Sequence, residues 1–199
     1  ISDALELDEA EQALWTQQFA AGYGAQPPLY TWLQWAVFKL AGVSVLSLSL
    51  LKNALLALTY AFVWLAARRI MAAPLAVLAA ASMLLLPQIG WESQRDLTHS
   101  VLVTTLASAT LYIVVRLIER PRPALYVALG IAAGLGIMSK YSYAVFLAAL
   151  GLALLTTRET RAVWRSPWIF VSGLMAAIIV LPHLLWLGTS GLDLAAMSV

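Results

Sequence analysis

Long apolar runs dominate the chain after residue 44, and short charged or proline-containing breaks separate them. An α-helix needs about 20 mostly apolar residues to cross a bilayer, with a tolerated range of roughly 17 to 25. Six runs meet or approach this length: residues 45–67, 74–90, 97–118, 124–139, 141–157 and 167–188. The pattern therefore predicts an all-α, polytopic transmembrane bundle of about six spans.

Residues 1–44 carry a different pattern. In segments 4–21 and 29–41, apolar residues recur at helical spacing, and polar side chains fill the remaining positions. Leu7, Ala10, Leu14 and Phe19 form the apolar stripe of the first segment. Both segments are too polar to span a bilayer. We therefore expect two amphipathic helices that lie along the membrane surface.

Composition agrees with a membrane protein. Apolar residues make up 62% of the 199 residues and charged residues 11%, whereas a soluble domain has about a quarter charged residues. The absence of cysteine excludes a disulfide framework, a thiolate metal site and a cysteine nucleophile. We expect one transmembrane domain over 1–199, with an outer amphipathic loop (1–44) and transmembrane helices (45–199). The first and last residues suggest a fragment of a larger chain.

Charge divides between the two ends of the predicted spans. One side carries mostly arginines: Arg68, Arg69, Arg116, Arg120, Arg122, Arg158, Arg161 and Arg165, against Glu119 and Glu159. The other side carries mostly acids: Asp3, Glu6, Asp8, Glu9, Glu11, Glu92, Asp96 and Asp193, against Lys39, Arg95 and Lys140. The positive-inside rule makes the arginine side cytoplasmic. The acidic side is then periplasmic, extracellular or lumenal.

Two acidic positions on that side are candidates for chemistry. Asp8 and Glu9 open the first amphipathic helix, where acids also favour the helix dipole. A carboxylate cluster can alternatively bind a divalent cation or act as a general base. Asp96 precedes a predicted span and suits an N-cap. It also shares a helix face with His99, and ionisable groups at a span edge often face a cavity.

Lysines provide a second set of candidates. Lys140 divides the apolar stretch 124–157, either as a lysine that snorkels to the interface or as a cation that meets a phosphate. Lys52 lies inside a predicted span and needs a partner or a wet cavity. Gly130 and Gly134 have the spacing of close helix packing. We interpret His183, which follows Pro182, as structural.

Together these motifs resemble one enzyme family. Leu7–Trp15 and Gly22–Leu33 look like the first outer loop of the family 39, ArnT-like glycosyltransferases, which are related to protein O-mannosyltransferases. Gln94–Leu97 resembles the second acidic position of that family, and Gly134–Tyr141 resembles its glycine- and lysine-containing stretch. The resemblance covers nearly the whole segment, and the motifs occur in the family's order.

The resemblance implies the GT-C fold and a set of site residues. It makes Asp8 and Asp96 catalytic carboxylates with Glu9 in support, and both aspartates tentative ligands of a divalent cation. It places Lys140 and Gln26 at the donor phosphate, although some relatives have a basic residue at the position of Gln26. It assigns substrate contacts to Tyr23, Tyr30 and His99. An aromatic residue of many relatives is replaced here by Glu11-Gln12.

The function implied by the resemblance is transfer of a sugar from a polyprenyl-phosphate carrier to a lipid, glycan or protein acceptor. The reaction would invert the anomeric centre on the periplasmic face of a bacterial inner membrane, among membrane lipids and without nucleic acid. A transporter or a non-catalytic membrane subunit is the alternative. Transporters place ionisable residues near the bilayer midplane. Here most ionisable residues lie at the ends of spans, which favours chemistry at one face.

Overall fold

The computed structural model describes residues 7–23, 26–93 and 98–190, and this part of the chain is helical apart from turns and one isolated bridge between Tyr23 and Gln26. The helices of the N-terminal half are α1 (Leu7–Trp15), α2 (Leu29–Ala41), α3 (Val45–Ile70) and α4 (Ala73–Ser82). A 3₁₀ turn (η1, Met83–Leu85) and a π-helical turn (η2, Gln88–Glu92) follow α4. The remaining helices are α6 (Thr98–Glu119), α7 (Pro123–Ser139), α8 (Tyr143–Ala153), α9 (Arg158–Arg165) and α10 (Trp168–Ser190).

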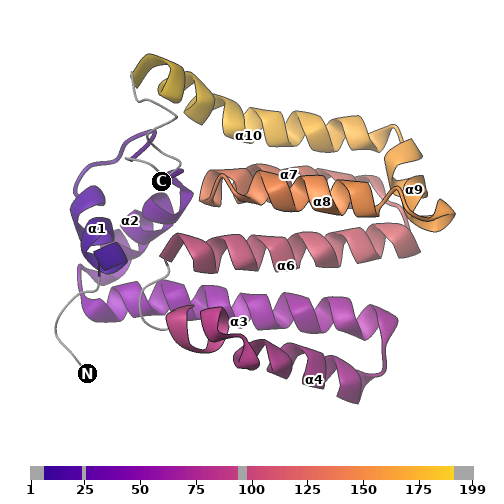
Figure 1. Cartoon of the computed structure of the whole chain (residues 1–199). Helices are drawn as coiled ribbons and strands as arrows, with labels where there is room; N and C mark the ends of the chain where they lie inside the picture. Colours follow the sequence, from indigo (N-terminus) through magenta and orange to yellow (C-terminus); the bar gives the residue numbers. More distant parts are fainter. Residues whose placement is uncertain (1–6, 24–25, 94–97, 191–199) are drawn as a thin grey trace.

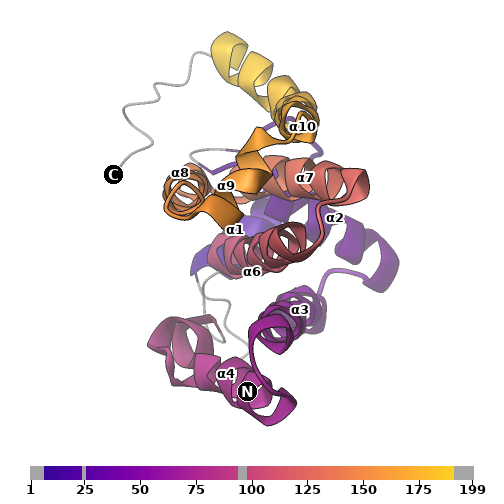
Figure 2. The ribbon, with the colours of Figure 1, turned by 90° about the vertical axis from the view of Figure 1, so that its right-hand side faces the viewer.

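The long helices run side by side, and the short helices lie at their two ends (Figure 1). Helices α1 and α2 lie at one end of the bundle, which we call the α1–α2 end, and α9 lies at the opposite, α9 end. Viewed from the α9 end, α3, α6, α7 and α10 follow one another across the molecule, with α4 beside α3 and α8 beside α7 (Figure 2). The prediction of an all-α bundle is confirmed.

Within the described ranges, three helices are long and apolar enough to cross a membrane: α3, α6 and α10. Three shorter apolar helices, over Ala73–Leu85, Pro123–Ser139 and Tyr143–Ala153, occupy the positions of the other expected spans. The expected span 74–90 is not one continuous helix. Leu86 is extended (φ −79°, ψ 117°) and interrupts it, because the residue before a proline, here Pro87, is sterically pushed out of the helical region.

Small and hydroxyl-bearing residues hold the central helices together. A Cβ at Gly134 would lie 2.9 Å from the Ile179 side chain of α10, and one at Gly130 would collide with Ser172. This confirms the predicted close packing. Thr59 of α3 and Thr105 of α6 share a hydrogen bond of 2.9 Å, a polar contact of the kind that joins helices where lipid gives no hydrophobic drive.

The arginine-rich side and the acidic side of the charge pattern correspond to the two ends of one bundle. Arg69 of α3 and Arg116 of α6 lie 3.7 and 3.9 Å from Glu119 at the α9 end, where the arginines of α9 are also exposed. Asp8 and Lys140 lie at the α1–α2 end, where each side chain contacts the first turn of α6. Alternate helix ends therefore gather on the same side, as the sequence predicts.

Helix α1 turns its polar face toward the bundle. Glu9 and Gln12 are buried, whereas Leu14 and Phe19 of the predicted apolar stripe are 63% and 62% exposed. An amphipathic helix at a membrane surface exposes its apolar side to lipid, and the bundle offers buried polar partners to the other side. The helix is shorter than the predicted 4–21: it ends at Trp15, where the chain turns toward α2.

Candidate functional site

The first turn of α6 receives a carboxylate from α1. One oxygen of Asp8, Oδ2, accepts hydrogen bonds from the backbone N–H of Thr98 at 3.2 Å and from the Thr98 hydroxyl at 3.3 Å. The first N–H groups of a helix have no partner within the helix, and the helix dipole favours a negative charge there. Asp8 therefore caps α6, in addition to lying in the first turn of its own helix.

Lys140 approaches the same turn of α6 from another direction. It follows the last residue of α7 in an extended conformation (φ −162°, ψ 134°), and its Nζ donates to the hydroxyl of Ser100 at 3.0 Å. Ser100 lies two residues after Thr98. The fold thus brings the Asp8 carboxylate and the Lys140 ammonium group, which belong to the first and the last of the sequence motifs, to one helix N-terminus.

A buried ion pair fixes α1 on the bundle. Lys52 Nζ lies 3.1 Å from Glu9 Oε1, and their side chains are 4% and 10% exposed. The sequence predicts that Lys52 needs a partner, and Glu9 is that partner. Because Glu9 is adjacent to Asp8, the pair also sets the position of Asp8 relative to α6.

His99 is held between three elements. Its Nδ1–H donates to the carbonyl of Ser139 at 3.4 Å, and its Nε2 accepts from the side-chain amide of Gln12 at 3.3 Å. Its ring lies 5.4 Å from that of Tyr30. Both ring nitrogens thus have protein partners in a neutral imidazole, as in a hydrogen-bonded interior side chain.

Two polar atoms beside His99 have no hydrogen-bond partner among the residues that the structure describes. They are the hydroxyl of Tyr30 and Oε1 of Gln12, in side chains that are 0% and 1% exposed. A buried polar atom without a partner costs about 1–3 kcal/mol. Burial raises the pKa of Tyr30 above that of an exposed tyrosine, and the charges of Glu9 and Asp8 raise it further. Tyr30 therefore stays a hydrogen-bond donor, and a ligand hydroxyl or carboxylate could accept from it.

Tyr23 and Gln26 serve the loop between α1 and α2. The Tyr23 hydroxyl donates to the carbonyl of Gln18 at 2.8 Å and accepts from the N–H of Ala20 at 2.7 Å. The Tyr23 ring stacks on Trp15 at 6.1 Å. Gln26 pairs with Tyr23 in the isolated bridge. The geometry gives Tyr23 a role in shaping the loop, so the predicted substrate contact of its hydroxyl gains no support.

A contact that the sequence did not predict joins this loop to α10. His183 donates from Nδ1 to the carbonyl of Ala21 at 3.0 Å, and its Nε2 accepts from the Tyr141 hydroxyl at 2.8 Å. Gly22 packs directly on the ring of Trp186. In the sequence this contact is marked by nothing more than a histidine inside an apolar run, which does not predict the residues that His183 contacts.

The second predicted carboxylate, Asp96, lies outside the described residues. Among the residues that the structure does describe, no group of three or more acidic or histidine side chains is arranged to hold a metal ion. Asp8 and Glu9 turn to different partners, Thr98 and Lys52. The described residues alone therefore do not form the ligand set of a divalent cation.

Comparison with known proteins identifies the class. Residues 25–186 match the family described as dolichyl-phosphate-mannose-protein mannosyltransferase. The chain belongs to this family of glycosyltransferases, as its motifs predict, and its apolar helices make it part of an integral membrane protein.

Three curated relatives, all from Rhizobium johnstonii, are similar to the chain. The lipopolysaccharide core galacturonosyltransferases RgtB and RgtA are 43% and 40% identical over 94% and 92% of this chain. The lipid A galacturonosyltransferase RgtD is 27% identical over 90% of the chain. The chain spans 38%, 37% and 38% of these relatives' lengths. No solved structure matches it.

Proposed function

We propose that the protein transfers a sugar from a polyprenyl-phosphate carrier to an acceptor hydroxyl on the non-cytoplasmic face of a membrane. The observation that carries this proposal is the meeting of Asp8 and Lys140 at the first turn of α6. A base and a cation at one helix N-terminus are what a displacement at a phosphate-linked sugar requires.

The chemistry follows from these two groups. The acceptor oxygen attacks the anomeric carbon and forms the new glycosidic bond, while the bond from that carbon to the carrier phosphate breaks. Asp8 takes the proton of the acceptor hydroxyl as general base. Lys140 compensates the charge that grows on the departing phosphate. Attack opposite the leaving group inverts the anomeric centre.

Asp8 and Lys140 must exchange partners during this cycle. In the present arrangement they bind Thr98 and Ser100. Substrate hydroxyls and the carrier phosphate replace these hydroxyl contacts. Losing the contacts costs little free energy, because α6 keeps its other hydrogen bonds. The Tyr30 hydroxyl and the Gln12 carbonyl, both without partners, are suited to donate to and accept from the transferred sugar.

The relatives suggest which sugar and acceptor to test. RgtA and RgtB are named as lipopolysaccharide core galacturonosyltransferases, and we extend this chemistry to the present protein. The proposed donor is therefore polyprenyl-phosphate-linked galacturonic acid, and the acceptor is a lipopolysaccharide core or lipid A. The arginines at the α9 end support a periplasmic site at the other end of the bundle in a bacterial inner membrane.

The test is a transfer assay with the full-length protein in lipid vesicles. We expect transfer from the polyprenyl-phosphate donor to truncated lipopolysaccharide, with the opposite anomeric configuration in the product, measured by mass spectrometry and NMR. Uridine-diphosphate galacturonic acid without carrier should give no product. Transfer from the nucleotide sugar alone, or retention of configuration, would overturn the proposal.

A further inference from the structure

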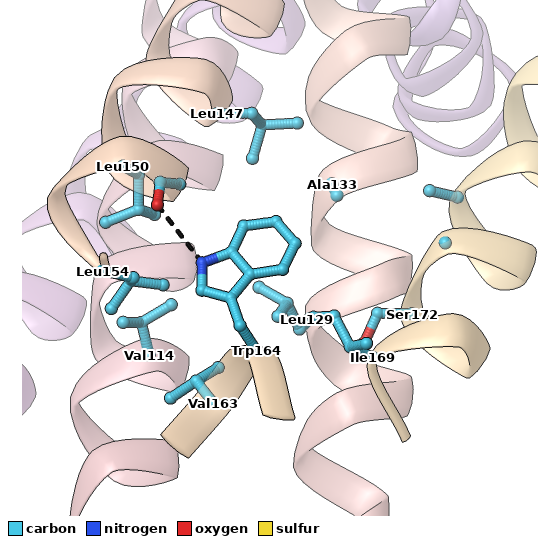
Figure 3. A pocket seen from close by; sticks show the side chains of 13 residues that line it. Val114, Leu129, Ala133, Leu147, Leu150, Leu154, Val163, Trp164, Ile169 and Ser172 are labelled. Atoms are coloured by element: carbon cyan, nitrogen blue, oxygen red, sulfur yellow. Dashed lines mark hydrogen bonds between the residues drawn. The ribbon is translucent and has the colours of Figure 1, made fainter. Parts of the chain in front are cut away.

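An apolar cavity of about 240 Å³ lies between α7, α8 and α10, in the half of the bundle nearer to α9. Figure 3 shows the indole of Trp164 from α9 reaching into it, with Leu129 and Ala133 of α7 on one side and leucines of α8 on the other. An apolar cavity of 150 Å³ is large enough for benzene and stays dry. This larger cavity can therefore hold a length of hydrocarbon chain.

The polar atoms at the cavity are already used by the protein. The Trp164 indole N–H donates to the carbonyl of Gly151 at 3.2 Å, a bond drawn in Figure 3. The Ser172 hydroxyl donates to the carbonyl of Tyr126 at 2.7 Å. Since neither group is available to a polar ligand, the lining selects an alkyl chain.

Helix α9 lies at one end of the cavity and is strongly amphipathic. Val163 is buried against the bundle, whereas Arg158 and Arg165 are exposed. Trp164 and Trp168 are 44% and 43% exposed, and tryptophans of this kind lie at the headgroup level of membranes. The same end carries Arg120 and Arg122, both exposed. The apolar cavity thus opens beside a cationic, tryptophan-bearing surface.

We propose that this cavity binds one acyl chain of an anionic phospholipid from the leaflet at the α9 end, with the headgroup phosphate against the arginines of α9. Arginine is suited to a phosphate because its fork of N–H donors matches the phosphate oxygens. The site is distinct from the proposed catalytic site and does not depend on it.

The exposed arginines at the α9 end favour a phospholipid over the tail of a sugar carrier. The proposed donor phosphate lies at Lys140, beyond the last residue of α7, whereas α9 is at the other end of the bundle. Helix α7 has 17 residues, which span roughly 25 Å. A phospholipid of the leaflet at the α9 end reaches the cavity directly.

Gly173 offers a variant that fills the cavity without disturbing the fold. It lines the cavity, and a Cβ added there would meet no atom within 4 Å. Leucine is also a better helix former than glycine. Gly188, on the same helix, has equally open surroundings and does not line the cavity. Gly173→Leu and Gly188→Leu are therefore a matched pair.

The experiment measures lipid retention by the full-length protein in detergent with native mass spectrometry. The probes are dioleoyl-phosphatidylglycerol and dioleoyl-phosphatidylcholine, which share their acyl chains. For the wild type and Gly188→Leu we expect binding of one phosphatidylglycerol, at least about tenfold tighter than phosphatidylcholine. Gly173→Leu should weaken both lipids by about tenfold or more. The double variant Arg158→Gln/Arg165→Gln should remove the preference for phosphatidylglycerol, while Lys39→Gln at the other end should keep it.

Thermal unfolding of the same samples completes the test. Phosphatidylglycerol should raise the unfolding temperature of the wild type and Gly188→Leu and leave that of Gly173→Leu unchanged. Equal lipid binding by Gly173→Leu and the wild type would overturn the proposal. A loss of stability of Gly173→Leu without any lipid response in the wild type would also overturn it, because a protein segment would then fill the cavity.

Discussion

Asp8 has an observed role as a helix cap and a proposed role as a general base, and a single substitution can separate them. As a cap of α6 it needs only an oxygen that accepts from Thr98. As a general base it must also take up a proton. Asparagine caps a helix about as well as aspartate and does not act as a base at neutral pH.

We therefore expect Asp8→Asn to keep its stability and lose its activity. The free energy of unfolding should change by less than about 1 kcal/mol, because the cap is retained. Turnover should fall by about 100-fold or more, the usual scale for a lost general base. Thermal unfolding and turnover of one purified sample measure both. Wild-type turnover would reduce Asp8 to a helix cap.

Lys140 separates an anchoring role from phosphate binding in the same way. In Lys140→Gln the side chain can still bond Ser100 but carries no charge, and charge-assisted hydrogen bonds are roughly twice as strong as neutral ones. Donor affinity should fall by about tenfold or more, equivalent to ~1.4 kcal/mol. Lys140→Arg should restore part of it, because a planar guanidinium has a different reach.

The control for Lys140 is Lys39→Gln, which removes an exposed cation of α2 from the same end of the protein. Donor titrations should show the largest loss of affinity in Lys140→Gln and a smaller loss in Lys140→Arg. Lys39→Gln should bind the donor as the wild type does. If Lys140→Gln binds the donor as the wild type does and folds normally, Lys140 only anchors the end of α7.

At the scale of elements, the ion pair between Glu9 and Lys52 determines where α1 sits. Removing one partner of a buried pair leaves an uncompensated buried charge, which typically costs 3–5 kcal/mol. We expect Glu9→Leu to destabilise the protein by about this amount and to lower turnover, since Asp8 moves with α1. The double variant Glu9→Leu/Lys52→Met should recover most of the stability.

The pair of Arg69 and Glu119 is the matched control for that prediction. Its side chains are 40% and 35% exposed, and breaking an exposed pair costs at most about 1 kcal/mol. Chemical unfolding in detergent compares Glu9→Leu with Glu119→Leu. Equal losses in the two variants would mean that the buried pair does not anchor α1.

Local sequence patterns predicted the ends of a helix well where residues of that helix alone determine them. The second amphipathic segment, 29–41, coincides with α2, and the basic pair Arg68-Arg69 lies in the last turn of α3. The run 74–90 is predicted to close at Pro87 and Gly90, whereas the structure interrupts the helix already at Leu86. The orientation of α1 was not predicted, because only the assembled bundle shows that its Glu9 and Gln12 bond to Lys52 and His99.

The candidate site was predictable as a set of residues and not as an arrangement. Sequence motifs singled out Asp8 and Lys140, but their meeting at Thr98 and Ser100 is a tertiary contact between α1, α6 and α7. The resemblance implies a ligand contact for Tyr23, and in the structure its hydroxyl bonds to Gln18 in its own loop. Nothing in the spacing of residues along one chain distinguishes these two uses.

At the scale of the whole molecule, the charge difference between the ends predicts the orientation in the membrane. The chain has no cysteine, so single cysteines report without background. Exposed positions at the two ends are Gln17 and Glu92, and Ala72 and Glu159. Cysteines at the first two should react with an impermeant reagent on intact cells whose outer membrane is permeabilised. Cysteines at the other two should react only after lysis of the inner membrane, and earlier labelling at Ala72 would reverse the topology.

The contact of His183 with Ala21 has a consequence for the order of events during synthesis. Its two residues are 162 positions apart, and a ribosome adds about 5–20 residues per second. The loop between α1 and α2 therefore waits roughly ten to thirty seconds until its partner on α10 has been made. Until then the nascent chain lacks the contact between Ala21 and His183. The loop between α1 and α2 is thus fixed to α10 late, after the helices between them have been synthesised.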